Sequence, residues 1–243
     1  MKKKKLTYYI LIVAMTLLIV ITSYNITAYI YNYFKHIKEM KRIEEEFVTD
    51  SSSDYLEIDL NELFKQNTDT VAYLKIEGTN ISYPVVQSND NDYYLDHDFN
   101  KDKNDEGAIF LDYRNDLDNL SRNNIIYGHG RLDKTMFGSL DELLKEEWYQ
   151  NNKPYIKVTT KKTKMIFEIF SVYTIYKEGY YLTTYFTSDM YFKKFLEELK
   201  TRSIIDFKST VNVTDKILTL STCQNNFGKR IVVHAKLIKK EDV

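Results

Sequence analysis

An uncharged run from Leu6 to Phe34 directly follows four lysines, Lys2 to Lys5, and it decides where the rest of the chain can fold. About 20 mainly apolar residues suffice for a helix that crosses a bilayer, and a lysine cluster before the helix keeps that end in the cytoplasm. A cleaved signal peptide is the alternative, with a shorter apolar core and a small-x-small cleavage site. Residues 22–25 read Thr-Ser-Tyr-Asn and offer no such site. We therefore expect a cytoplasmic tail at residues 1–5 and a retained anchor, in contact with membrane lipid, at residues 6–31.

An anchor of this orientation makes the chain a single-pass protein of the cell membrane and places the remaining residues outside the cytoplasm. Small secreted domains are often stabilised by several disulfides, whereas this chain has one cysteine, Cys223. Stability must then come from an apolar core, and the residues beyond the anchor and its flank suffice for one domain of ordinary size. The formal net charge of -1 argues against nucleic acid as a partner.

Two short segments join the anchor to this domain. Residues 36–47 place apolar side chains near helical spacing and predict a short amphipathic helix. The polar residues 48–54 predict a hinge. We therefore divide the remaining chain into a juxtamembrane helix and linker at residues 32–54 and a folded domain at residues 55–243.

The domain is predicted to be mainly β with inserted helices. Runs rich in β-branched and aromatic residues, bounded by Gly, Asn or Asp, predict strands at residues 71–76, 81–87, 108–113, 124–127, 155–159, 165–175, 216–220 and 230–238. Helical patterns occupy residues 59–66, 138–148 and 188–202, the last with Ser188-Asp189 as its N-cap. About eight strands in one domain favour a closed or nearly closed barrel.

The single cysteine ends the segment Thr219-Leu220-Ser221-Thr222-Cys223. It cannot form a disulfide within the chain, and alone it cannot build a sulfur-based metal site. A lone cysteine on a strand is more often a small apolar filler than a nucleophile. The surrounding sequence favours the nucleophile, because a second strand-like run stops at His129 between Gly128 and Gly130. A cysteine and a histidine need only a fold that brings them together, and Arg230 supplies a fixed positive charge for an oxyanion.

Four segments, in this order, resemble the signature motifs of sortases, and of class B in particular. They are Tyr127-Gly128-His129, Met136-Phe137-Gly138-Ser139-Leu140, Thr219-Leu220-Ser221-Thr222-Cys223 and Arg230-Ile231-Val232-Val233-His234-Ala235-Lys236-Leu237. The resemblance extends from about Tyr73 to Lys239. It implies an eight-stranded sortase-type β-barrel, preceded by N-terminal helices and the transmembrane helix.

The resemblance further implies a cysteine transpeptidase. Cys223 would attack a peptide carbonyl of a sorting signal and form a thioester, which an amine resolves into a new amide. His129 would protonate the leaving amine and deprotonate the incoming one. Arg230 would donate to the oxyanion or to substrate carbonyls. Fewer residues separate Cys223 from Arg230 than in many class B members, so Lys229 competes for the role of the cation, although the family pattern of residues 231–236 favours Arg230.

The same likeness implies a substrate groove and its partners. The groove would be lined by Asn91, Leu95, Tyr127, Tyr181, Leu182, Ser221 and Gln224. The substrate would be the sorting-signal peptide of a surface protein, near Asn-Pro-x-Thr, and the acceptor an amine of a cell-wall peptidoglycan precursor or cross-bridge in a Gram-positive cell. Two alternatives stay open: a pilus-polymerising sortase with a lysine acceptor, and a membrane-tethered peptide-binding module without turnover.

An acidic segment at residues 96–106 raises the question of a metal. Its acidic side chains are Asp96, Asp98, Asp102, Asp105 and Glu106. The segment lacks the glycine and the terminal glutamate of an EF-hand loop at the required spacing. We therefore expect a solvated acidic surface, no metal site and no cofactor.

Overall fold

The computed structural model describes residues 2–49, 54–176, 178–223 and 228–243. The chain forms two compact units, Met1–Ile43 and Glu44–Val243. One long helix accounts for the first unit, and a closed β-barrel for most of the second.

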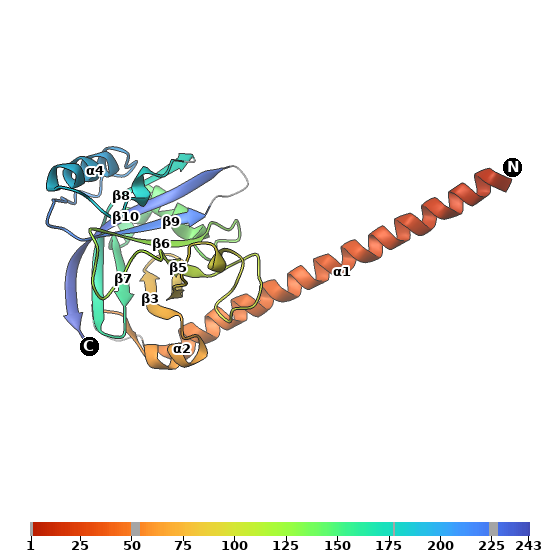
Figure 1. The fold of residues 1–243 in the computed structure, drawn as a ribbon, viewed down its shortest axis with the longest axis horizontal. Helices are drawn as coiled ribbons and strands as arrows, with labels where there is room; N and C mark the ends of the chain where they lie inside the picture. Colours follow the sequence, from red (N-terminus) through yellow and green to blue (C-terminus); the bar gives the residue numbers. More distant parts are fainter. Residues whose placement is uncertain (1, 50–53, 177, 224–227) are drawn as a thin grey trace. The chain divides into compact units, whose positions relative to one another are not determined.

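The helix α1 (Lys2–Phe47) runs without interruption and contains neither glycine nor proline (Figure 1). From Lys5 onward it is long and apolar enough to cross a membrane, by length and composition. The hydroxyl of Thr16 donates to the carbonyl of Ile12 at 3.1 Å, and that of Thr27 to the carbonyl of Ser23 at 2.8 Å. These polar side chains are therefore satisfied within the helix, as an apolar environment requires. The amphipathic helix expected at residues 36–47 is the continuation of α1 rather than a separate element.

A small two-stranded sheet follows α1. β1 (Val48–Thr49) pairs antiparallel with β2 (Glu57–Ile58). The expected hinge at residues 48–54 therefore begins in a strand, and its residues 50–53 lie outside the described part of the chain.

Eight strands close into the predicted barrel. They are β3 (Thr70–Ile76), β4 (Ser82–Val86), β5 (Ile109–Leu111), β6 (Asn123–His129), β7 (Tyr155–Thr159), β8 (Thr163–Tyr176), β9 (Ile217–Cys223) and β10 (Lys229–Asp242). Around the barrel their order is β10-β8-β7-β3-β4-β5-β6-β9. The pairs β4–β5 and β6–β9 are parallel and the others are antiparallel. The closed barrel predicted from the number of strands is therefore confirmed, and closure leaves it without an open sheet edge.

Helices fill the connections between strands. α2 (Leu60–Gln66) starts at Asp59, whose carboxylate accepts from the amide of Asn61 at 3.0 Å. α4 (Asp189–Thr201) starts, as predicted, after Ser188, whose hydroxyl accepts from the amide of Tyr191. One face of α4 packs on the barrel through Phe192, Leu196 and Leu199. Two short 3-10 helices, η1 (Tyr93–Leu95) and η3 (Tyr180–Leu182), lie between strands.

The single helix predicted at residues 138–148 is wrong. The structure has a 3-10 helix, η2 (Gly138–Leu144), and a separate α-helix, α3 (Glu146–Asn151), with Lys145 extended between them. A side chain at Gly138 would lie 2.1 Å from the carbonyl oxygen of Arg131. The start of η2 is therefore pressed against another backbone segment, a tertiary constraint that helical spacing does not reveal.

Candidate active site

The parallel pairing of β6 with β9 brings His129 and Cys223 together. The register begins at Asn123 beside Ile217 and ends at His129 beside Cys223. Neighbouring strands in a sheet lie about 5 Å apart. The two residues therefore end adjacent strands as direct neighbours, although β7, β8 and α4 separate them in the sequence.

The imidazole of His129 is held by a backbone carbonyl. Its Nε2 lies 2.8 Å from the oxygen of Leu95, at the end of η1. A carbonyl only accepts hydrogen bonds, so in the neutral ring Nε2 carries the hydrogen and Nδ1 holds the lone pair. Leu95 was expected in the groove for its side chain, and the structure adds a role for its carbonyl.

Two glycines permit this arrangement. Gly107 has a φ of +60°, and a Cβ on it would lie 2.5 Å from the oxygen of Tyr94, 2.8 Å from that of Leu95 and 3.1 Å from Cδ2 of His129. A Cβ on Gly128 would lie 2.3 Å from Cδ1 of Ile109. The close backbone approach expected beside the histidine is therefore present.

Arg230 lies at the start of β10 and contacts expected groove residues. Its Nη1 donates to the hydroxyl of Tyr181 at 3.1 Å, and that hydroxyl pairs with Oγ of Ser221 at 3.0 Å. The register of β10 on β9 places Val232 beside Ser221. Arg230 and Cys223 lie two residues beyond this pair, each on its own strand.

Lys229, the competing cation, has different neighbours. It is the Cα partner of Tyr176, and its ammonium lies 6.0 Å from the centroid of that ring. Consecutive residues of a strand point to opposite faces of the sheet. The strand register therefore favours Arg230 for a role beside Tyr181.

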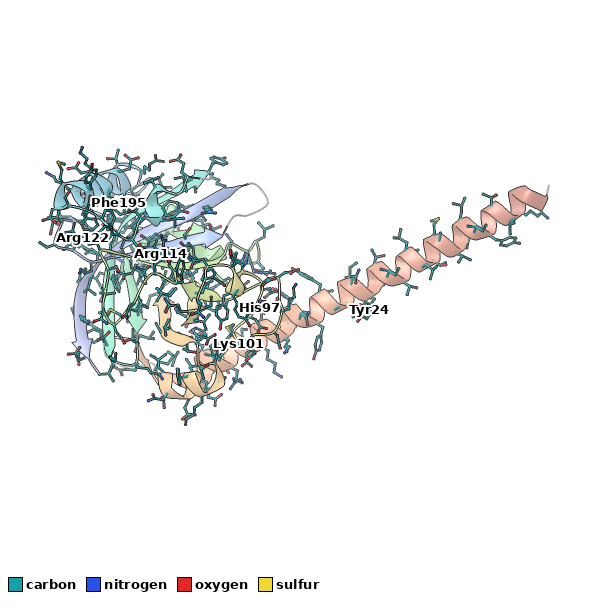
Figure 2. All side chains as sticks on the ribbon, in the orientation of Figure 1. Tyr24, His97, Lys101, Arg114, Arg122 and Phe195 are labelled. Carbon is teal, nitrogen blue, oxygen red and sulfur yellow. The ribbon has the colours of Figure 1, made fainter. Side chains whose placement is uncertain are left out.

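A buried carboxylate that was not among the expected residues organises the groove. Asp112, fully buried, accepts from Nε of Arg114 at 2.8 Å, from Nη2 of Arg114 at 2.7 Å, from the hydroxyl of Tyr127 at 2.9 Å and from Nδ2 of Asn91 at 3.0 Å. Arg114, labelled in Figure 2, also donates to the carbonyl of Leu182 at 3.1 Å. One carboxylate thereby connects three of the expected groove residues. The only sequence signal for it is an aspartate and an arginine two residues apart after an apolar strand.

The protonation of Asp112 follows from these contacts. Burial alone would raise the pKa of its carboxyl, but the hydrogen bonds from Arg114 and Tyr127 outweigh burial and hold the pKa below its ordinary value. Burial and the neighbouring carboxylate raise the pKa of Tyr127 well above that of a free tyrosine. Asp112 is therefore ionised and Tyr127 is a neutral donor at physiological pH.

A second buried carboxylate lies near His129. Glu106 precedes Gly107, is 2 % exposed, and its Oε1 lies 3.3 Å from Nη2 of Arg131. Burial raises the pKa of Glu106 to about 7, even though Arg131 opposes the shift. Elsewhere in the acidic segment, Asp98 accepts from the amides of its own loop at 2.9 and 3.1 Å. The segment is therefore a structured loop with two buried acids, Asp98 and Glu106, not only the solvated surface that was expected.

Six of the seven expected groove residues are in the described part of the chain, and all six have contacts around this site. Gln224 lies outside the described residues. The other six are Asn91, Leu95, Tyr127, Tyr181, Leu182 and Ser221, joined through Asp112, Arg114, His129 or Arg230.

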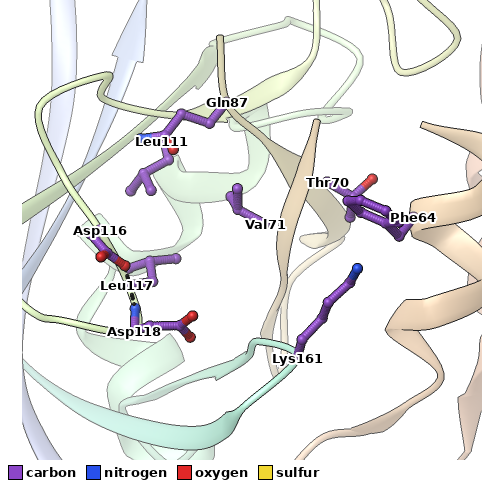
Figure 3. A pocket seen from close by; sticks show the side chains of 9 residues that line it. All are labelled: Phe64, Thr70, Val71, Gln87, Leu111, Asp116, Leu117, Asp118 and Lys161. Atoms are coloured by element: carbon purple, nitrogen blue, oxygen red, sulfur yellow. Dashed lines mark hydrogen bonds between the residues drawn. The ribbon is translucent and has the colours of Figure 1, made fainter. Parts of the chain in front are cut away.

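A cavity of about 190 Å³ lies near α2 and is lined by different residues. Figure 3 shows its lining: Phe64, Thr70, Val71, Gln87, Leu111, Asp116, Leu117, Asp118 and Lys161. The ammonium of Lys161 lies 3.0 Å from the centroid of the Phe64 ring. Among the side chains that the structure describes, this lining shares none with the expected catalytic or groove sets.

Comparisons with known proteins agree with the motifs. The sortase domain family model matches residues 74–238. Sortase B of Staphylococcus aureus (strain NCTC 8325 / PS 47) is 41% identical over 180 residues, which cover 73% of each chain. Two solved structures are also similar: sortase B from B. anthracis in complex with AAEK1 (TM-score 0.76, 36% identity, 88% of this chain and 99% of that chain) and the Staphylococcus aureus sortase B–substrate complex (TM-score 0.73, 35% identity, 86% and 97%).

Proposed function

The chain belongs to the sortase family, in class B, and is a cysteine transpeptidase; on this premise we propose that Cys223 is its nucleophile, His129 its general acid and base, and Arg230 its oxyanion donor. The observation that carries the assignment is the register of β6 on β9, in which His129 is the partner of Cys223. Membership in this family sets aside the alternative of a binding module without turnover.

The reaction has two acyl transfers. The Cys223 thiolate attacks the scissile carbonyl carbon, and the tetrahedral oxyanion collapses as the carbon–nitrogen bond breaks. Nδ1 of His129 takes the thiol proton as the thiolate forms and gives it to the leaving nitrogen, which leaves a thioester on the enzyme. An acceptor amine then attacks the thioester carbon and gives a proton to His129, and the thiolate departs as the amide forms. Because Nε2 of His129 is bonded to the carbonyl of Leu95, the proton moves through Nδ1.

Arg230 stabilises the negative charge that develops on the carbonyl oxygen. A guanidinium remains charged and presents a rigid fork of donors. The hydrogen bond from Nη1 to Tyr181 orients the guanidinium before substrate binds. Lys229 pairs with Tyr176 in the register and points to the opposite face of the sheet from Arg230, so it is the weaker candidate.

The substrate is a sorting-signal peptide of a surface protein, near Asn-Pro-x-Thr. It lies in a groove lined by Asn91, Leu95, Tyr127, Tyr181, Leu182, Ser221 and Gln224. The similarity to a sortase B–substrate complex supports a peptide partner of this kind. The acceptor is a peptidoglycan amine of a Gram-positive cell wall, and the lysine acceptor of a pilus-polymerising sortase is the second candidate.

The apolar part of α1 anchors the enzyme in the cell membrane by a single pass, with residues 1–5 in the cytoplasm and the catalytic domain, residues 55–243, outside it. The length and composition of α1 support this assignment. Residues 6–31 form the span and residues 32–54 the juxtamembrane segment and linker.

The test is product analysis by mass spectrometry with the chain lacking residues 1–31. An Asn-Pro-x-Thr peptide is mixed with a glycine peptide, a lysine side-chain amine or neither, and we expect an amide product with the preferred amine and a trapped adduct of the N-terminal fragment on Cys223. Cys223→Ala is expected to abolish cleavage while it keeps the wild-type melting temperature. Undiminished turnover in this variant would overturn the catalytic assignment.

A further inference from the structure

The segment Tyr180–Leu182 is fixed by donors from outside it. Nδ2 of Asn123 donates to the carbonyl of Tyr181 at 3.0 Å and to that of Thr183 at 2.9 Å. Arg114 donates to the carbonyl of Leu182 at 3.1 Å. Tyr181 and Leu182 are groove residues in the proposed function, so whatever orients Asn123 also shapes the groove.

Asn123 is itself oriented by a buried hydroxyl. Oγ1 of Thr219 donates to Oδ1 of Asn123 at 2.6 Å and lies 2.9 Å from Nδ1 of His234. Thr219, Asn123 and His234 are all 0% exposed. Since the hydroxyl hydrogen of Thr219 is used on Asn123, the bond to His234 must be donated by Nδ1.

The other nitrogen of His234 faces a second hydroxyl. Nε2 lies 2.9 Å from the hydroxyl of Tyr173, which accepts from the hydroxyl of Tyr180 at 2.7 Å. Tyr173 therefore has its own hydrogen to give to Nε2, which accepts. The donors run in one direction: Tyr180 to Tyr173 to His234, then His234 to Thr219 to Asn123, and from Asn123 to the carbonyls of Tyr181 and Thr183.

Only one form of the imidazole completes this path. A ring with hydrogen on both nitrogens would face the Tyr173 hydroxyl with a second donor, and the hydrogen of that hydroxyl would lose its acceptor on Nε2. Burial lowers the pKa of His234 to about 3, which keeps the ring neutral at physiological pH. The neighbours of the ring are Phe170, Tyr173 and Tyr181, together with Thr219.

We propose that His234 is a positioning residue for substrate binding, as the neutral tautomer with hydrogen on Nδ1. It links the two halves of a one-way hydrogen-bond path. This path starts at the Tyr180 side chain and ends on the backbone of the same groove segment. This role rests on the proposed function, in which the segment that holds Tyr181 and Leu182 forms part of the groove for the sorting peptide. His234 itself touches neither the peptide nor the reacting atoms.

The test uses a matched pair of isosteric variants. Thr219→Val cuts the path between His234 and Asn123, whereas Thr159→Val removes an equally buried threonine hydrogen bond, to the carbonyl of Leu56 at 2.8 Å, that lies outside the path. We expect Thr219→Val to raise KM for the sorting peptide about three- to tenfold, the equivalent of one ordinary hydrogen bond, with kcat and the rate of Cys223 alkylation nearly unchanged. Thr159→Val should leave KM unchanged. An unchanged KM in Thr219→Val, or an equal rise in both variants, would overturn the proposal.

Two further measurements do not depend on turnover. Hydrogen exchange should be faster in Thr219→Val at the amides of Leu182 and Thr183, which donate to Gly179 at 3.0 Å and Tyr180 at 3.3 Å. Nitrogen-15 spectra should show His234 protonated on Nδ1 and not titrating between about pH 5 and pH 8. Hydrogen on Nε2, or unchanged exchange, would refute the path even in an inactive preparation. If wild-type enzyme fails to cleave the peptide but both signatures appear, the proposed substrate is wrong and the hydrogen-bond path stands.

Discussion

Replacing Gly107 with alanine tests whether the Leu95 carbonyl positions His129, the proposed general acid and base. The new Cβ would lie 2.5 Å from the Tyr94 oxygen and 2.8 Å from the Leu95 oxygen, distances that real Cβ atoms do not adopt. Both contacts are backbone atoms, so η1 must move by about half an ångström or more, at a cost of about 1–3 kcal/mol. The left-handed conformation of residue 107 adds about 1 kcal/mol for an L side chain. We expect a loss of about 3 kcal/mol in the free energy of unfolding, or roughly 6–12 °C in melting temperature.

The effect on activity should exceed the effect on folding. The displaced Leu95 carbonyl is the acceptor for Nε2 of His129, so the ring loses its orientation. Misplacement of a catalytic group by about 1 Å can cost about 100-fold in rate, and we expect kcat to fall at least tenfold at a temperature where the variant is folded. Gly179→Ala is the matched control, because a Cβ there meets nothing within 4 Å. Calorimetry and steady-state cleavage of the sorting peptide measure both effects. Wild-type kcat in a folded Gly107→Ala enzyme would refute the role given to the Leu95 carbonyl.

Three further predictions concern charged groups. Arg230→Lys should lose about 100-fold in kcat/KM because lysine lacks the fork of donors, whereas Lys229→Ala should stay within a few-fold of wild type; the reverse result in the same assay would move the cation to Lys229. Asp112→Asn should lower the free energy of unfolding in urea at pH 7 by about 2–3 kcal/mol, a value reduced because Arg114 is 39% exposed. Wild type should lose this stability as pH falls below the ordinary aspartate pKa of 3.8, whereas the variant should show no such loss. Because the pKa of Glu106 is raised to about 7 from 4.5, wild-type stability should fall as pH rises through this interval and Glu106→Gln should not show that slope; parallel pH profiles would contradict the assignment.

The elements predicted from the sequence were those whose signal is local. Each predicted strand has a counterpart in the barrel, because runs of β-branched and aromatic residues mark a strand without knowledge of its partners. The N-cap at Ser188 is equally local. The helix at residues 138–148 was not predictable in its true form, because neither the 3-10 form of residues 138–144 nor the extended backbone of Lys145 leaves a mark in the helical spacing of the sequence.

The candidate site likewise has features that local sequence signals predict and features that depend on tertiary contacts. The proposed catalytic residues were named from four short motifs, and the register of β6 on β9 places two of them, His129 and Cys223, side by side. Asp112 escaped notice because its partners Asn91 and Tyr127 are remote in sequence. The Leu95 carbonyl was hidden for a different reason: every residue has a carbonyl, so no residue type indicates that this one holds a histidine.

The parallel pair β6–β9 also determines when during folding the enzyme acquires its chemistry. Parallel strands joined by a long connection pair late, because the chain must lose the entropy of closing a long loop before the strands gain their stabilising contacts. His129 and Cys223 become neighbours only when β9 pairs with β6, and β7, β8 and α4 lie between these two strands in the sequence. A chain whose barrel has not closed therefore has His129 and Cys223 far apart. The proposed catalytic pair is assembled only when the barrel closes.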